Sequence, residues 1–464
     1  MAKGDTMSYA APFSLLWRNA GDPVQAELFG EDSCIESWLS VERALAMAQA
    51  SLGVIGPSDA EAIVRAARIG NIDRDRLWRD AQNVGYPILG LVRQISAHCP
   101  AGPDGRVHYG ATTQDIMDTA LALQMSRSLE ALDEQLQRLG DALAERATEH
   151  AGTVMPGRTH AQQAVPTTFG ATLATLLDQV RRQRTRLQQA HERIAVVSLF
   201  GAGGTNAAEG PRSVGIRSRL AAELGLADVP VPWHVDRDVL SEYGWICATI
   251  AGTCAKLGRN IVDLSRTEIG EVFEPFTSHR GASSTMPQKV NPISSELMIG
   301  VGAVAGALAS GLVRIQEAGH ERAAGEWYLV PNLGCLAGSA LGEALVVAEG
   351  MRVDPQRMAA NLDLDGGLIM AEAMMIQLAP AMGREHAHDL VYEAAERARE
   401  QKRTLHEIMP VVAAEQGRAD LLPEHLVGPS DYVGEAGRIA STAVERWRAT
   451  RALPAGPAIA DLGG

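Results

Sequence analysis

Apolar residues at helical spacing run through the middle of this 464-residue chain. Between residues 116 and 150 there is no proline, and the spacing of large apolar side chains alternates between four and three. The repeat consists of Met125, Leu129, Leu132, Leu136, Leu139 and Leu143. Residues spaced in this way lie on one face of a helix, so the sequence predicts a long helix with a continuous apolar stripe.

Four further segments with helical periodicity predict long helices over residues 167–199, 239–272, 292–316 and 333–351. Five long helices with short connections favour an extended bundle. Shorter helical patterns precede His108, among them 32–52 and 57–69, and others follow a break at Val353–Pro355. We therefore expect an all-α fold of three helical domains, which cover residues 1–108, 109–353 and 354–464.

The balance of charge excludes one large class of function. The chain carries 42 Lys and Arg against 56 Asp and Glu, which gives a formal net charge of −14. A protein that clamps nucleic acid needs a basic face to offset the phosphate charge, so we expect no nucleic-acid partner. The aromatic content of 4% favours closely packed helices over an aromatic-rich β-sandwich.

The five cysteines are scattered and include no CxxC spacing. That pattern argues against a disulfide or zinc framework and favours a reducing compartment. The first thirty residues contain no basic start followed by an uninterrupted apolar stretch, so we expect no secretory signal. The prediction is a cytoplasmic protein without a bound metal.

One segment, residues 297–313, contains 17 residues without a charge. It is at the short limit for a membrane span, and its many Gly, Ala, Val and Ser residues let helix backbones approach closely. We therefore predict a buried helix in a packed bundle, with no membrane contact.

Candidate chemistry is concentrated in Gly281–Pro292, which reads GASSTMPQKVNP. The segment places hydroxyl groups, a lysine and an amide ahead of a predicted helix start, where free backbone N–H groups favour an anion. A serine-rich capping loop would explain Ser283 and Ser284 alone. Lys289 and Asn291 stand two residues apart between prolines, and this rarer pattern favours a binding loop.

Two other segments also lie at predicted helix entrances. In residues 107–119, Thr112, Thr113 and Gln114 precede the first long helix, where they suit a carboxylate or phosphate; plain helix capping by Thr or Asp is the stronger reading of that segment alone. In residues 157–170, His160 precedes the second long helix, and a histidine at such a junction is more often structural than catalytic.

Together, the three segments resemble the fumarase/aspartase superfamily, in which three distant motifs form one site. Gly281–Pro292 matches the superfamily's GSSxMPxKxNP signature, with Ala282 in place of a glycine. Residues 157–164 match GRTHxQxA, and residues 108–115 match HxGxTxxD, in the family's order. Further segments look most like the 3-carboxy-cis,cis-muconate cycloisomerase and adenylosuccinate lyase branch; they are residues 232–238, 270–275, 348–354 and 367–373.

The resemblance implies β-elimination without a cofactor. A base removes the proton from the carbon beside a carboxylate, a doubly charged intermediate forms, and a leaving group departs from the next carbon. By motif match, Ser283 would be the base, with Ser284 supporting the loop. Lys289 and Asn291 would stabilise the Ser283 alkoxide, because a serine is otherwise a poor base.

The resemblance also implies roles for residues outside the signature. His160 would be the general acid on the leaving-group side, and Glu296 would orient it. The substrate carboxylates would be held by Thr112, Thr113, Gln114 and Asn291, with His108 nearby. Arg322 lies in a stretch that lines the leaving-group side in relatives.

Three departures bear on the substrate. Cycloisomerases of this branch often carry Trp where His160 stands, and adenylosuccinate lyases usually carry Arg where Val290 stands. The stretch from Arg322 to Pro331 looks shorter than in either relative by about four residues, one helical turn.

We therefore predict a lyase that acts on a succinate-type small dicarboxylate and releases fumarate or an analogue, with a nitrogen or other heteroatom leaving group that could include the nitro group of nitrosuccinate. One alternative is 3-carboxy-cis,cis-muconate cycloisomerase of aromatic catabolism. Another is a catalytically silent structural homologue, against which the retained motif residues argue.

The separation of the motifs also bears on assembly. Because they lie at the entrances of different long helices, one extended chain cannot easily bring them together, and the charge-free face of residues 297–313 needs a cover. We predict a homotetramer with a shared helical core, in which each active site draws on three subunits.

Overall fold

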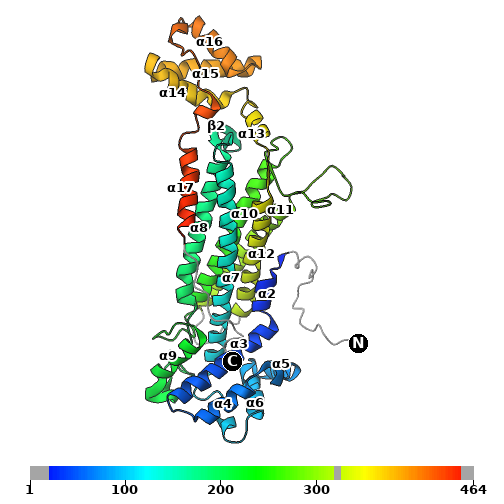
Figure 1. Cartoon of the computed structure of the whole chain (residues 1–464), viewed down its shortest axis with the longest axis vertical. Coiled ribbons are helices and arrows are strands. Elements are labelled where there is room, and N and C mark those ends of the chain that lie inside the picture. The colour runs from blue at the N-terminus through cyan, green and yellow to red at the C-terminus, as the bar shows by residue number, and fades with distance from the viewer. Residues whose placement is uncertain (1–19, 318–324, 451–464) are drawn as a thin grey trace.

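The computed structural model describes residues 20–317 and 325–450, and it confirms the all-α prediction (Figure 1). Five long helices run lengthwise through the molecule. They are α7 (Thr113–Glu149), α8 (Phe169–Ile194), α10 (Asp238–Leu264), α11 (Ile293–Arg314) and α12 (Glu326–Gly350). All five occur where the apolar period predicts them, with two corrections to their bounds. The helix predicted over 239–272 ends at Leu264, and α12 begins seven residues before the predicted start at residue 333.

The bundle forms because each helix buries its apolar stripe against the others. The six residues of the α7 repeat, from Met125 to Leu143, are each at most 2% exposed. On α8, Leu177, Val180, Leu187 and Ile194 are fully buried. These side chains share one core cluster with residues of α10, α11 and α12, so the three-four spacing of the sequence sets how the bundle packs.

A second core lies at the end of the bundle where α7 begins (Figure 1). The short helix α2 (Pro23–Leu28) precedes this core and packs against α7 and α12. The helices of the core are α3 (Glu31–Ser51), α4 (Pro57–Ala66), α5 (Arg74–Val84), α6 (Ile88–Ala97) and α9 (Ser213–Leu224). Short 3-10 turns join them: η2 (Ile69–Asn71), η3 (Pro103–Arg106) and η4 (Ala207–Arg212). Because α9 packs on α3, the segment between two central helices contributes to this N-terminal core.

A third core lies at the opposite end of the bundle. It is built from α14 (Ala371–Met382), α15 (Arg384–Gln401) and α16 (Leu405–Glu415). The helix α13 (Pro355–Asn361) precedes it, and Met358 of α13 packs in the central core. The chain then returns along α7 and α8 as α17 (Ala436–Arg448), whose Trp447 is buried in the central core. The domain boundaries near residues 108 and 353 stay predictions. Two helices pack outside the domain predicted for their residues: α9 packs in the N-terminal core, and α17 packs in the central core.

Two small antiparallel sheets complete the described structure. The hairpin of β1 (Val154–Thr159) and β2 (Gln162–Thr168) stands between α7 and α8. The short strands β3 (Val272–Phe273) and β4 (Arg352–Val353) pair where the chain leaves α10 and α12. Both sheets lie at the end of the bundle that carries the third core (Figure 1).

The prediction that residues 297–313 form a buried helix is wrong for the single chain. By length and composition α11 and α12 could each cross a membrane, but 67% of the most apolar window is buried in α12 and only 22% in α11. The inward side chains of α11, such as Met298, Val301 and Ala305, do pack in the core. Other small residues of α11, including Gly300, Ala303, Gly306 and Ala307, are exposed, so nothing in the described chain covers them.

Candidate active site

The three predicted site segments occupy three separate places in one chain. Thr112 precedes the first residue of α7, whereas His160 lies beyond its other end. Because α7 has 37 residues, these two positions are about 55 Å apart along the helix axis. The Gly281–Pro292 loop, called the signature loop below, precedes α11 and projects from the side of the bundle (Figure 1).

His160 does not stand at a helix entrance, as predicted, but at the tip of the β1–β2 hairpin. Thr159 pairs with Gln162, so His160 and Ala161 form a two-residue loop. Both have positive φ, of 50° and 63°, as a type I′ turn requires. Neither is glycine, so both conformations are strained, and such strain concentrates at functional sites. The His160 side chain is exposed.

A buried ion pair fixes the hairpin to the bundle. Both terminal nitrogens of Arg158 donate to the Glu271 carboxylate, at 2.8 and 2.6 Å, and Glu271 is fully buried. Glu271 also accepts a hydrogen bond of 2.7 Å from Asn361 of α13. A bidentate pair restricts orientation as well as distance, so the arm that carries His160 is held firmly at its base.

The signature loop directs two of its own amides at Ser283. The backbone N–H groups of Met286 and Thr285 donate to Ser283 Oγ at 3.1 and 3.3 Å. Hydrogen bonds of this kind favour the charged form of an oxygen. Ser283 is half-buried, whereas Ser284 and Lys289 are exposed.

Backbone contacts hold the two ends of the signature loop together. Asn291 N donates to Gly281 O at 2.8 Å, and Ala282 bridges to Val290. Gly281 has φ +68°, and a Cβ there would lie 2.3 Å from Asn291 O, so glycine is required at that position. Ala282 is exposed, which explains why the departure from the signature at this position is tolerated.

The N-terminus of α11 is already capped by the chain itself, contrary to the prediction of free N–H groups for an anion. The buried Glu274 carboxylate accepts from Ser294 N at 3.3 Å and from Ser295 N at 2.7 Å. It also lies 3.4 Å from Arg280. Glu296, one residue further on, is exposed, and within residues 20–317 and 325–450 no hydrogen bond joins it to His160.

We expect Glu274→Gln to lower the free energy of unfolding by about 1–2 kcal/mol, because an amide nitrogen would face a backbone donor where a carboxylate oxygen now accepts. The same change should loosen the signature loop and reduce turnover, as measured by urea unfolding and steady-state assay. Glu343→Gln is the matched control, since the Glu343 carboxylate contacts only the Ser294 hydroxyl of this helix start. Equal losses in both variants would contradict the capping role.

Asp115 organises the start of α7. Its carboxylate accepts from Thr112 N at 2.9 Å, Phe200 N at 2.8 Å and Gly201 N at 3.0 Å, and it contacts His234 Nε2 at 2.8 Å. The side chain is fully buried. Thr112 and Thr113 are half-exposed, so both lie at the surface of this turn.

Gln114 faces inward and belongs to a buried charge network. Its amide donates to Asp118 at 2.6 Å, and Asp118 pairs with both terminal nitrogens of Arg237, at 2.9 and 3.1 Å. Arg237 also donates to Glu326 at 2.9 Å. Burial raises the pKa of Asp118 and of Glu326, although Arg237 opposes the rise.

Five supporting residues were not predicted from the sequence: Asp115, Asp118, Arg237, Glu271 and Glu274. All five lie inside the motif segments 107–119, 232–238 and 270–275. One signal in the sequence could have indicated them. Asp115 and Asp118 are acidic residues at helical spacing, next to apolar residues that the helical pattern assigns to the core. Arg322 lies outside the described residues.

His108 completes the segment before α7. Its Nδ1 lies 2.6 Å from the Glu42 carboxylate of α3, and Glu42 is 1% exposed. Among residues 20–317 and 325–450, no three His, Cys, Asp or Glu side chains form a group that could hold a metal ion.

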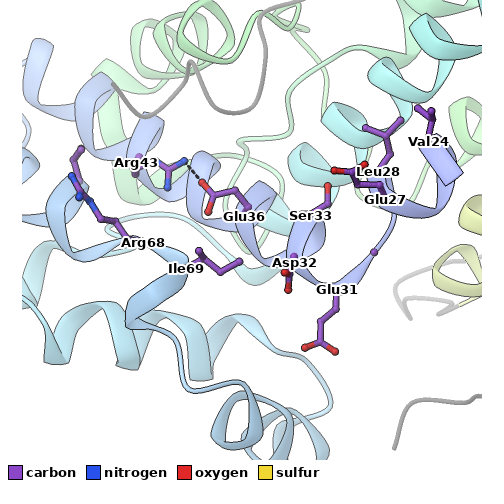
Figure 2. Close-up of a pocket in the computed structure, with 12 residues that line it drawn as sticks. Val24, Glu27, Leu28, Glu31, Asp32, Ser33, Glu36, Arg43, Arg68 and Ile69 are labelled. Atoms are coloured by element: carbon purple, nitrogen blue, oxygen red, sulfur yellow. Dashed lines mark hydrogen bonds and ion pairs between the residues drawn. The ribbon is translucent and has the colours of Figure 1, made fainter. Parts of the chain in front are cut away.

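A groove of about 920 Å³ lies between α2, α3 and α4 (Figure 2), and no predicted site residue lines it. Its charged lining is mainly acidic, with Glu27, Glu31, Asp32 and Glu36, and Arg43 is paired with Glu36 at 2.6 Å. The four carboxylates outnumber the two guanidinium groups of the lining, Arg43 and Arg68, so the groove carries a net negative charge and is a poor site for a dicarboxylate.

Comparison with known proteins identifies the relatives of this chain. The family described as Lyase matches residues 22–306, and the family described as Adenylosuccinate lyase C-terminus matches residues 367–443. A 3-carboxy-cis,cis-muconate cycloisomerase of Pseudomonas aeruginosa is 40% identical, over 89% of this chain and 92% of the relative. A nitrosuccinate lyase of Streptomyces davaonensis is 36% identical, over 92% of this chain and 93% of the relative.

A solved structure agrees with these sequence matches. The 3-carboxy-cis,cis-muconate lactonizing enzyme from Pseudomonas putida matches with a TM-score of 0.86 and 36% identity, over 94% of this chain and 99% of that one. With the helical bundle and the family-ordered motifs, these matches show that the chain is an enzyme that belongs to the lyase family of the fumarase/aspartase superfamily.

Proposed function

We propose that the enzyme catalyses β-elimination from a succinate-type dicarboxylate and releases fumarate or a close analogue, with a nitrogen or other heteroatom leaving group. The observation that carries the proposal is the environment of Ser283. Its hydroxyl oxygen accepts hydrogen bonds from two backbone N–H groups of a loop that also contains Lys289 and Asn291. The difficult species in such a reaction is the dianion formed after proton removal, and preorganised donors and a cation stabilise it.

The proposed reaction moves one proton to Ser283 and another from His160 to the leaving group. Ser283, as the alkoxide, takes the proton from the carbon beside one carboxylate, and the electron pair of that C–H bond becomes part of the dianion. The pair then forms the new double bond, and the bond to the leaving group breaks with its electrons on the leaving atom. His160, oriented by Glu296, protonates that atom. Thr112 and Thr113 supply hydroxyls to a carboxylate, and Gln114 shapes their turn from within.

We infer that the working unit is a cytoplasmic homotetramer. A single chain leaves His160 and the Thr112 turn about 55 Å apart, so one site needs segments from different subunits. The exposed small residues of α11, including Gly300, Ala303 and Ala307, supply a face that a neighbouring helix can approach closely. The described cysteines are all free thiols, as a reducing compartment maintains.

The second candidate is 3-carboxy-cis,cis-muconate cycloisomerase, which the 40% identity to a relative of that name favours. Lactonisation joins a substrate carboxylate to a double bond, so there is no leaving group to protonate. An exposed histidine on a rigid arm therefore fits the elimination better.

Two spectroscopic assays separate these candidates. We expect the absorbance of fumarate to appear with at least one member of a panel of substituted succinates that includes nitrosuccinate. We expect weak or no loss of the diene absorbance of 3-carboxy-cis,cis-muconate. Turnover of carboxymuconate with kcat/KM above roughly 10⁵ M⁻¹s⁻¹ would instead establish the cycloisomerase.

A further inference from the structure

The segment from His108 to Gly110 is tied to α3 at two points. Glu42 contacts His108 Nδ1 at 2.6 Å, and Gln49 donates to Tyr109 O at 2.6 Å. Glu42 and Gln49 are seven residues apart, two turns of the same helix, so they present one face to the segment. Gly110 has φ +75°, and a Cβ there would lie 2.6 Å from the Glu209 carboxylate of η4. The segment therefore has little freedom to move.

His108 itself has an unusual backbone conformation. Its φ is +58°, which is strained for a residue other than glycine. The strained backbone holds the imidazole against Glu42, while the side chain keeps 19% of its surface exposed. Because Nδ1 is committed to Glu42, Nε2 is the nitrogen left for a ligand.

The charge around His108 is mainly negative. Glu42 of α3 and Asp115 of α7 act on it directly, and Glu209 of η4 lies beside Gly110. Arg106 of η3, just before the segment, stacks its guanidinium on the Tyr109 ring, 5.7 Å from the ring centroid. Burial alone would lower the pKa of His108, but Glu42 and Asp115 outweigh it and the pKa is raised. One oxygen of Glu42, Oε2, is buried without a partner in the described residues, and the other contacts His108, so the imidazole is the group with which this buried carboxylate pairs.

We propose that Glu42 is a positioning residue that keeps His108 as an imidazolium, whose Nε2–H binds one carboxylate of the substrate. This inference rests on the proposed function in one respect, namely that the segment from His108 to Gln114 receives a substrate carboxylate. A charged donor makes a stronger hydrogen bond to a carboxylate than a neutral one. Glu42 would thus give the site a cation separate from Lys289.

The first test is a titration that needs no substrate. Histidine labelled with ¹³C at Cε1 is incorporated into the full-length protein, and His108→Gln identifies the His108 signal. We expect its midpoint to lie above the ordinary histidine value in the wild type and to move to lower pH in Glu42→Gln. A wild-type midpoint at or below the ordinary value would overturn the proposal, even if Glu42→Gln does not fold.

The second test is kinetic, with whichever succinate the wild type converts. In the proposal the substrate binds to protonated His108, so kcat/KM should fall at alkaline pH as His108 loses its proton. Glu42→Gln should move this fall to lower pH. Near pH 8 we expect KM to rise at least about tenfold with a much smaller change in kcat. Glu42→Asp keeps the charge and should recover part of the loss.

Glu36→Gln is the matched control. Glu36 lies on the same helix and pairs with Arg43 at 2.6 Å (Figure 2), so this variant removes a carboxylate from an ion pair without touching His108. An equal rise in KM in the control would overturn the role of Glu42. If no succinate is converted but the titration behaves as expected, the proposed function fails and the Glu42–His108 pair stands. If fumarate forms but Glu42→Gln leaves the titration of His108 unchanged, the proposed function stands and the role of Glu42 fails.

Discussion

A chain that carries Ser283→Ala is expected to lose at least about 100-fold in turnover while it keeps its fold. The Ser283 side chain is half-buried in a surface loop and contributes no core area, so the free energy of unfolding should change by less than about 0.5 kcal/mol. The hydroxyl that two amides contact is lost, and a methyl group cannot accept a proton. Steady-state rates and urea unfolding measure the two effects.

Ser278→Ala is the matched control for this variant. Ser278 is an exposed serine five residues upstream in the same connection, and its loss should leave both the rate and the stability near those of the wild type. A Ser283→Ala enzyme that keeps more than a tenth of the wild-type rate would remove Ser283 from the mechanism.

Two inactive chains should restore activity when their subunits are mixed. Neither His160→Ala nor Ser283→Ala alone should be active, but random exchange leaves about a quarter of the sites with both side chains intact if they come from different subunits. The expected recovery is therefore about a quarter of the wild-type rate, measured after dissociation and reassembly of an equal mixture.

The control pairs Ser283→Ala with Lys289→Ala. These residues share one signature loop, so every site receives both from the same subunit and no recovery is expected. Two results would contradict the shared site. One is light scattering that shows a monomer under conditions in which the enzyme is active, and the other is no recovery of activity when His160→Ala and Ser283→Ala chains are mixed.

The sequence predicted the bundle well because its helices are specified locally. The α7 repeat buries every one of its six members, and helical spacing is visible without knowledge of the partner. The predicted start of α12, residue 333, follows Pro331, and proline seldom stands inside a helix. In the structure Pro331 is the sixth residue of α12, where its missing N–H removes one intrahelical hydrogen bond and the helix continues through it.

The hairpin that carries His160 could not be predicted from local pattern. Its strands contain Pro156 and Pro166, which argue against strands, and its turn lacks the Asn-Gly or Gly signal of a tight hairpin. The turn conformation of His160 and Ala161 is imposed by the surrounding structure. The position of the motif in the sequence was therefore informative, but its secondary structure was not.

The partners of the site residues depended on contacts far apart in sequence. Glu42 reaches His108 across 66 residues, and Asp115 reaches Phe200 across 85. Glu274 looks like an ordinary acidic residue until the fold places it against the start of α11. The motif residues could be named from the chain alone, whereas their supporting residues required the tertiary structure.

The two-residue strand β3 has a consequence for engineering this enzyme. Glu271 and Glu274 flank it, and they fix the His160 arm and the base of the signature loop respectively. A substitution that tilts β3 would therefore displace the elements that carry both proposed proton-transfer residues, and in the proposed tetramer it would do so in two different sites. A library meant to change substrate preference should hold residues 271–274 constant and diversify the surface around them.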